Sequence, residues 1–389
     1  MLRKIREDSL VLGIIFLTVL LVMLLQNFGY KSYSRYVTDT LHYDQGIVVE
    51  ISDEDIEYDK SLKIYLGTQN LKVRMTEGTE KGTVIEVTNY LTKTHNVVAK
   101  VNMPLIINVD QPDEVEQYYT VFNYDRRFAM LACAAVLVAA IICIGGGKGI
   151  RAVLGLLYSL FVVIGFLLPA VFSGWSPIWT SILAAVLSTA VTLLLLNGQS
   201  KKTAAAILAT MIGMFFSLAF YTVMSVLLHI DGFSSSEAEG LILINEGTGL
   251  QIHDVLFAGV LISSLGAIMD VGMSIVSALY EVYLHNPTLT AKEIFQSGIE
   301  IGKDMIGTMT NTLILAFTGS ALISLLVFIS YQVQFNQLFN SNYLSIEIAQ
   351  GLCGTFGIVL TIPAASAIMA VLLAGRKKND KASERMETE

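Results

Sequence analysis

Acidic residues within long apolar stretches are the features of this sequence best suited to chemistry. Asp270 lies near the middle of the apolar stretch 255–280. At 3.6 residues per helical turn, it shares one face with Ser274, Ser277 and Glu281. An ionisable side chain inside a membrane span is costly and usually lines a cavity or a pathway. This row, called the first acidic row, therefore predicts an ion or substrate pathway with Asp270 as its proton or cation site.

A second acidic row leads into the next apolar stretch, 304–331. It consists of Glu300, Asp304, Thr308 and Asn311, which share a face at the same period. Both rows start at the same membrane surface and climb inward, so antiparallel packing would place them opposite each other. We therefore predict that the two rows face one another, with Asp270 at the level of Thr308 and Asn311 or deeper.

Less specific interpretations of the second row remain open. Glu300 and Asp304 lie near the interface, where Lys303 or Lys292 could pair with them as solvated ions. Asn311 could instead join two helices through a hydrogen bond.

Small residues and one proline accompany these rows. Small side chains allow helix backbones to approach closely, whereas a proline inside a helix is expected to kink or break it. The residues that we assign to helix packing or hinges are Gly272, Gly302, Gly307, Gly354 and Pro363. Broken helices with acidic groups at mid-membrane are typical of ion and substrate sites in secondary transporters.

No enzyme, cofactor or metal site is expected from the motifs. The sequence has no CxxC pair, Walker A loop, HExxH or GxSxG motif. His229 and Asp231 with His253 and Asp254 could supply metal ligands, but capping or solvated roles are commoner for such residues. The acidic run from Asp53 to Asp59 matches no EF-hand loop and is more typical of a solvated loop.

The composition is that of a mainly α, polytopic membrane protein. Hydrophobic residues make up 53% of the 389 residues and charged residues 15%, against about 25% charged in an average soluble domain. A net charge of −8 argues against nucleic acid as a partner. Stretches long enough to span a bilayer occur at 10–28, 128–145, 151–172, 177–196, 203–228, 255–280, 304–331 and 345–374, which predicts eight transmembrane helices.

Basic residues set the orientation of these helices. With eight spans, all the basic clusters near helix ends fall on one side, and the opposite loops 173–176, 230–254 and 332–344 contain no Lys or Arg. By the positive-inside rule, both termini are expected to be cytoplasmic. The first stretch lacks a small-x-small cleavage site, so we expect an uncleaved anchor rather than a signal peptide. Leu241 to Ile244, in the loop 230–254, suggest an interfacial helix.

Four segments follow from this topology: the N-terminus and first anchor at 1–28, an extracytoplasmic β domain at 29–126, a seven-helix membrane domain at 127–375, and a polar cytoplasmic tail at 376–389. In the β domain, about six short strands with Gly-containing turns suggest a small closed barrel of the OB or SH3-like kind. The predicted strands include 46–51, 61–67, 71–75 and 96–103. The three cysteines all fall in predicted spans, so no disulfide is expected in this domain.

Two further features concern the cytoplasmic segment 285–303. Thr290 followed by Glu293 is a capping box, which predicts a helix start. The apolar residues that follow predict an amphipathic segment lying along the membrane before the seventh span.

At these motifs the chain resembles the YibE/F family of bacterial membrane proteins. The resemblance rests on the segments 270–274, 277–281 and 302–312, with Asn286-Pro287 between them, and Lys303 stands where an Arg is expected. It implies a possible hetero-partner from the same family, but no established activity.

Two functions remain open. The first is a secondary transporter or permease component in the lipid bilayer. The second is an envelope sensor or assembly protein whose outer domain binds a ligand or partner.

Overall fold

The computed structural model describes residues 2–29, 40–111, 117–234, 240–242 and 249–387. The chain divides into two compact units, one of residues 1–31 with 141–389 and one of residues 32–140. Each unit is described by itself.

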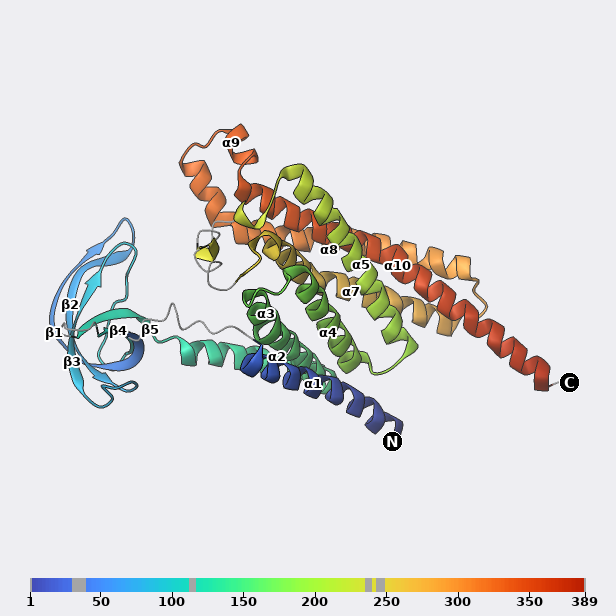
Figure 1. Cartoon of the computed structure of the whole chain (residues 1–389), viewed down its shortest axis with the longest axis horizontal. Helices are drawn as coiled ribbons and strands as arrows, with labels where there is room; N and C mark the ends of the chain where they lie inside the picture. Colours follow the sequence, from blue (N-terminus) through green and yellow to red (C-terminus); the bar gives the residue numbers. More distant parts are fainter. Residues whose placement is uncertain (1, 30–39, 112–116, 235–239, 243–248, 388–389) are drawn as a thin grey trace. The chain divides into compact units, whose positions relative to one another are not determined.

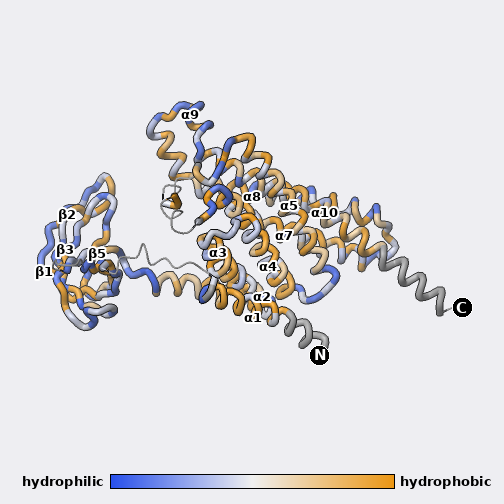
Figure 2. Tube along the Cα trace, viewed as in Figure 1, coloured by the Kyte–Doolittle hydropathy of each residue, from blue (hydrophilic) through white to orange (hydrophobic). Residues whose placement is uncertain are grey.

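The helical unit consists mainly of long apolar helices (Figures 1 and 2). Its first helices are α1 (Leu2–Phe28), the end of α2 (Arg127–Phe161), the π-helical turn η1 (Val162–Leu167) and α3 (Leu168–Phe172). They are followed by α4 (Pro177–Asn197), α5 (Lys201–Leu228) and α7 (Val255–His285), with short turns η2 (Gly232–Ser234) and η3 (Ile252–Asp254) before α7. The chain ends with α8 (Ala291–Ser330), α9 (Phe335–Phe339) and α10 (Asn342–Glu387).

The centre of this unit is α10, which packs against α5, α7 and α8. Buried residues such as Ile268, Ile275 and Ile358 form the core between these helices. Several buried hydroxyls in the core donate to a carbonyl four residues earlier in their own helix: Thr210, Ser264, Thr361 and Ser366. In contrast, Ser217 Oγ of α5 donates across to the Cys353 carbonyl of α10 at 2.8 Å.

Among the described residues, six helices are long and apolar enough to cross a membrane, and Val11–Asn27 is a shorter apolar helix. The eight spans predicted from the sequence are thus not confirmed. The difference arises at two places. The predicted span 10–28 is represented only by the shorter helix, and Arg127–Phe172 forms one 46-residue candidate where the sequence predicts the two spans 128–145 and 151–172.

This long candidate is interrupted at Gly146, whose φ of 53° and ψ of −132° are not helical. A Cβ placed on Gly149 would lie 2.3 Å from the carbonyl oxygen of Ile141. Residues eight positions apart come this close only when the chain folds back, because eight residues of straight helix span about 12 Å. The Gly145–Gly147 segment is therefore a sharp turn between two helical halves.

The helix start predicted at Thr290 is confirmed. Thr290 and Glu293 form a reciprocal capping box at the beginning of α8. The amphipathic segment and the seventh predicted span belong to this single helix of 40 residues.

The second unit contains one antiparallel sheet in the order β3-β2-β1-β4-β5. Its strands are β1 (Leu41–Asp59), β2 (Ile64–Met75), β3 (Val84–Leu91), β4 (Pro104–Asp110) and β5 (Tyr118–Tyr124). The long central strand β1 pairs with β2 along residues 46–59 and with β4 along residues 41–47. Register shifts after Val48 and Ile51 let it bend.

The bent sheet curls around an apolar core that includes Val48, Leu71, Val73, Leu105 and Ile107. The edge strands β3 and β5 approach each other, but no ladder joins them within the described residues. The observed fold is therefore a curled five-stranded sheet, and the finer prediction of an OB or SH3-like closed barrel is not confirmed.

Three details of this sheet differ from the sequence prediction. The acidic run Asp53–Asp59 belongs to β1, where every residue of the run pairs with β2. The strands predicted at 61–67 and 71–75 are one strand, since Gln69 and Asn70 pair with Asn89 and Thr88 of β3. The strand β5 was not predicted.

The segment 96–103, predicted as a strand, is irregular. In this segment, hydrogen bonds with buried side chains replace the backbone hydrogen bonds of a strand ladder. Asn89 Nδ2 donates to the Val97 carbonyl at 2.7 Å, and Gln69 Oε1 accepts from the Ala99 N–H at 2.9 Å. Asn89 and Gln69 are themselves hydrogen-bonded at 3.1 Å.

Candidate functional site

The first acidic row lies on the face of α7 that the other helices leave uncovered. The buried face of α7 contains Ile268, Val271, Ile275 and Leu279. At 100° per residue, Asp270 and its row lie on the opposite side of the helix. Asp270, Ser274 and Glu281 are exposed and Ser277 is half-buried.

Asp270 has no hydrogen bond or ion pair with any residue that the structure describes. In contrast, Asp254, at the start of the same helix, pairs with Nδ1 of His253 at 2.9 Å. Asp270 is therefore a carboxyl group in the apolar middle of a candidate membrane span, uncovered and without a described partner.

The second acidic row likewise lies on an uncovered face of its helix, α8. Glu300, Asp304, Thr308 and Asn311 are all exposed. Glu300 Oε1 pairs with Lys303 Nζ at 2.6 Å, as one interpretation of the sequence expected. Because both side chains are well exposed, this pair contributes little stability.

The two rows are not packed against each other, so the predicted arrangement of facing rows is wrong in this respect. Both α7 and α8 pack on α10, and each uses its apolar or small-residue face to do so. The polar side chains of each row repeat with the same helical period as the covered face. They lie half a turn away, on the opposite side of the helix, and so remain outside the helix contacts. Periodicity correctly grouped the residues of each row, but it did not indicate which face α10 would cover.

Three of the glycines that we assign to helix packing lie close to a neighbouring helix. A Cβ on Gly302 would lie 2.1 Å from Cγ2 of Ile362, and a Cβ on Gly354 would lie 2.6 Å from Cδ2 of Leu313. A Cβ on Gly272 would lie 3.1 Å from the Thr210 hydroxyl. These glycines allow close contact of α7, α8 and α10 with their neighbours, and Gly302 of α8 makes its contact with α10.

Two members of the packing and hinge set behave differently. A Cβ on Gly307 would have nothing within 4 Å, so this glycine packs against no described residue. Helix α10 continues through Pro363, and the expected break is absent. Because Pro363 has no N–H, the helix lacks one backbone hydrogen bond there. The neighbouring turns of this long helix are buried against α5, α7 and α8.

The weaker metal hypotheses find no support in the described part of the chain, where no three His, Cys, Asp or Glu residues gather. Asp231 accepts from the Phe233 N–H at 3.1 Å. Asp59 caps a turn through Ser61, and this hydroxyl and the backbone N–H groups of Leu62 and Ser61 lower the pKa of Asp59. Of the predicted interfacial helix, residues 243 and 244 lie outside the described residues.

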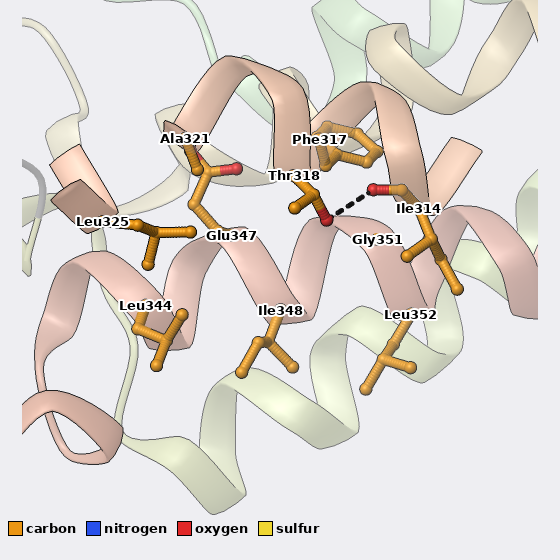
Figure 3. Close-up of a pocket in the computed structure, with 10 residues that line it drawn as sticks. All are labelled: Ile314, Phe317, Thr318, Ala321, Leu325, Leu344, Glu347, Ile348, Gly351 and Leu352. Atoms are coloured by element: carbon orange, nitrogen blue, oxygen red, sulfur yellow. Dashed lines mark hydrogen bonds between the residues drawn. The ribbon is translucent and has the colours of Figure 1, made fainter. Parts of the chain in front are cut away.

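The structure adds one acidic residue that the sequence analysis missed. Glu347 of α10 lines a cavity between α8 and α10 (Figure 3). Its Oε2 atom is buried and has no hydrogen-bond partner among the described residues. The sequence did contain a signal, because Glu347 is the only acidic residue between Asp304 and the basic cluster at Arg376.

The sheet unit has a separate, larger cavity of about 610 Å³. Its lining combines aromatic and aliphatic side chains with charged groups, among them Tyr65, Tyr124, Glu54 and Lys100. Gln69, which also lines it, donates to Glu54 at 3.0 Å. This hollow can accommodate a small polar ligand or a side chain of a partner.

A comparison with protein families matches residues 133–375 to the family model described as YibE/F-like protein. The matched region contains both acidic rows, the packing glycines and Glu347. No curated protein and no solved structure matches the chain.

Proposed function

We propose that this chain, which belongs to the YibE/F-like protein family, is a component of a secondary transporter or permease in the bacterial cytoplasmic membrane. The observation that carries the proposal is Asp270, an acidic residue in the middle of an apolar helix without a described partner. Ionisable groups at such positions commonly bind protons or ions that move across the membrane. The polar side chains of Ser274 and Ser277 extend the row from Asp270 toward Glu281 at the end of α7.

The exposure of the acidic rows supports a second chain in the working assembly. An acidic residue facing lipid at the helix centre costs roughly 2.5–3.5 kcal/mol on insertion scales. A partner that covers α7 would remove Asp270 from lipid and could complete a polar path beside it. We propose another member of the same family as this partner. The chain acts without enzymatic chemistry in this proposal.

Replacing Asp270 with Asn should abolish proton-coupled activity, because Asn keeps the size and polarity of the side chain but cannot ionise. The full chain, with its partner where one copurifies, is reconstituted in liposomes that contain a pH-sensitive dye. A potassium diffusion potential then drives proton movement. We expect the initial rate in the Asp270→Asn protein to fall at least tenfold.

Asp254→Asn is the matched control, since it removes a carboxylate from the same helix at an end where His253 pairs with it. This control should keep the wild-type rate. Wild-type proton movement in the Asp270→Asn protein, at equal incorporation and thermal stability, would refute the proposed site.

The proposed topology has eight spans, with both termini cytoplasmic and residues 29–126 outside. Its support is the turn at Gly146, because a straight 46-residue helix would be about 69 Å long, roughly twice the thickness of a ~30 Å hydrocarbon core. Two antiparallel spans joined at Gly145–Gly147 resolve this mismatch. They also place Lys148 and Arg151 on the side of the other basic clusters.

Single cysteines in a cysteine-free background should report this topology. In intact cells, a membrane-impermeant maleimide should label Glu57→Cys and Asn340→Cys. Lys148→Cys and Lys201→Cys should react only after the cells are permeabilised. Labelling of Lys148→Cys in intact cells would contradict the eight-span topology and favour a different path for residues 127–172.

An envelope sensor is the second candidate function, and the 610 Å³ cavity of the sheet unit favours it. The two functions make opposite predictions in one experiment. Removal of residues 36–122 should abolish a sensor response and leave Asp270→Asn without effect. A permease should retain proton movement after this deletion and lose it in the Asp270→Asn protein.

A further inference from the structure

The cavity between α8 and α10 is almost entirely apolar. It has a volume of about 180 Å³. The lining residues come from two segments, around Phe317 in α8 and around Ile348 in α10 (Figure 3). Only two side chains in the lining, Thr318 and Glu347, carry polar groups.

Of these two, only Glu347 can carry a charge. The Thr318 hydroxyl donates to the Ile314 carbonyl of its own helix at 2.9 Å, the bond drawn in Figure 3. The Oε2 atom of Glu347 is buried without a partner in the described structure. A buried carboxylate oxygen of this kind carries a desolvation cost unless a donor or a cation meets it.

The segments that line the cavity supply no cation. Residues 304–375, which include the whole lining, contain no Lys, Arg or His. A bound cation would supply the positive charge that these segments lack.

We infer that this cavity is a binding site for an apolar monocation, an ammonium or phosphonium group that carries hydrocarbon substituents. Glu347 would bind the charge, and Ile314, Phe317 and Leu352 would contact the hydrocarbon. The ring of Phe317 can add a cation–π contribution. A small hydrated ion fits poorly, because one carboxylate in an apolar lining replaces little of its hydration shell.

The position of Glu347 along its helix agrees with an amphiphilic ligand. Glu347 is five residues from the start of α10 at Asn342, or about 7.5 Å along the axis. Leu352 is about as far again toward the middle of the helix. A ligand with its charge near the membrane surface and its apolar part directed inward matches this order of side chains. The site does not depend on the pathway proposed at Asp270.

Binding of tritiated phenyltrimethylammonium to the full chain in nanodiscs of zwitterionic lipid tests this inference, because a ligand with one ring suits a cavity of about 180 Å³. We expect saturable binding to the wild-type protein and at least tenfold weaker binding to Glu347→Gln, which keeps the side-chain volume but removes the charge. Glu57→Gln, an equal loss of charge on β1, should bind like the wild type. Benzenesulfonate, with the same ring and the opposite charge, should not compete.

A second variant keeps the test informative if Glu347→Gln misfolds. A Cβ on Gly351 would lie 3.8 Å from the Phe317 ring, an ordinary contact distance, so Gly351→Leu should fill the cavity and reduce binding while Glu347 remains. Equal binding by the wild type and Glu347→Gln, or equal binding by the wild type and a folded Gly351→Leu, would overturn the inference. Competition by benzenesulfonate would do the same.

Discussion

Replacing Gly302 with Ala should destabilise the helical unit, whereas the same replacement at Gly307, five residues along the same helix, should not. At Gly302 the new Cβ would lie 2.1 Å from Cγ2 of Ile362. That methyl group moves only by rotation about χ1, and a β-branched residue in a helix strongly prefers one χ1 rotamer, so α10 must move. Overpacking of this kind typically costs 1–3 kcal/mol.

At Gly307 the new methyl group would meet no described atom within 4 Å. Alanine favours a helix over glycine by about 1 kcal/mol, so Gly307→Ala should leave stability unchanged or raise it slightly. Unfolding of the purified chain in mixed detergent micelles, followed by tryptophan fluorescence, measures both variants. Equal stability of the two variants would show that the contact between Gly302 and Ile362 does not hold α8 against α10.

Replacing Asn89 with Leu should release the irregular segment 96–100 from the sheet. Leucine has a similar size but cannot donate to the Val97 carbonyl or to Oε1 of Gln69, the two acceptors of Asn89. Val97 is buried, and each buried group left without a partner costs about 1–3 kcal/mol. Gln69 Oε1 still accepts from the Ala99 N–H, so the Val97 carbonyl is the acceptor left without a partner, and we expect a loss of roughly 1–3 kcal/mol.

Limited digestion with trypsin provides the measurement, because Lys93 precedes the released segment and Lys100 is its last residue. Cleavage at these lysines in the full-length Asn89→Leu protein should be more than tenfold faster than in the wild type. Thr88→Val is the control, since its hydroxyl bonds to Asn70 on the exposed side of the same strand. Rapid cleavage of Thr88→Val as well would mean that β3 as a whole is sensitive and that the Asn89 network is not decisive.

The sequence was sufficient to predict features that depend on residues close together along the chain. The capping box at Thr290, the apolar helices and the grouping of each acidic row all follow from spacing within one helix. The contacts between α8 and α10 at Gly302 and Gly354 depend instead on which helices become neighbours, and 3.6-residue periodicity contains no information about that choice. For the same reason, periodicity could not show that the rows at Asp270 and Asp304 would lie outside the contacts.

Side-chain hydrogen bonds explain the main error in the sheet. Val97 and Ala99 are buried in alternation as in a strand, so the pattern suggested one. Asn89 and Gln69, distant in sequence, satisfy the backbone of this segment and remove the need for a ladder. Glu347 was missed for a simpler reason. One acidic residue in a mostly apolar stretch of 30 residues hardly alters the average hydropathy of that stretch.

The hydroxyls in the core of the helical unit have a mechanical consequence. Thr210, Ser264, Thr361 and Ser366 donate within their own helices, so a sliding motion of α10 along its neighbours would leave these bonds intact. Resistance to sliding would come instead from shape, where side chains such as Thr361 sit over Gly213 and Gly272. An interface of this kind moves in steps of about one helical turn, 5.4 Å, because intermediate positions force side chains into backbone. Such stepwise shear between two packed positions would give the membrane helices two discrete states, at the cost of the bond from Ser217 of α5 to the Cys353 carbonyl of α10.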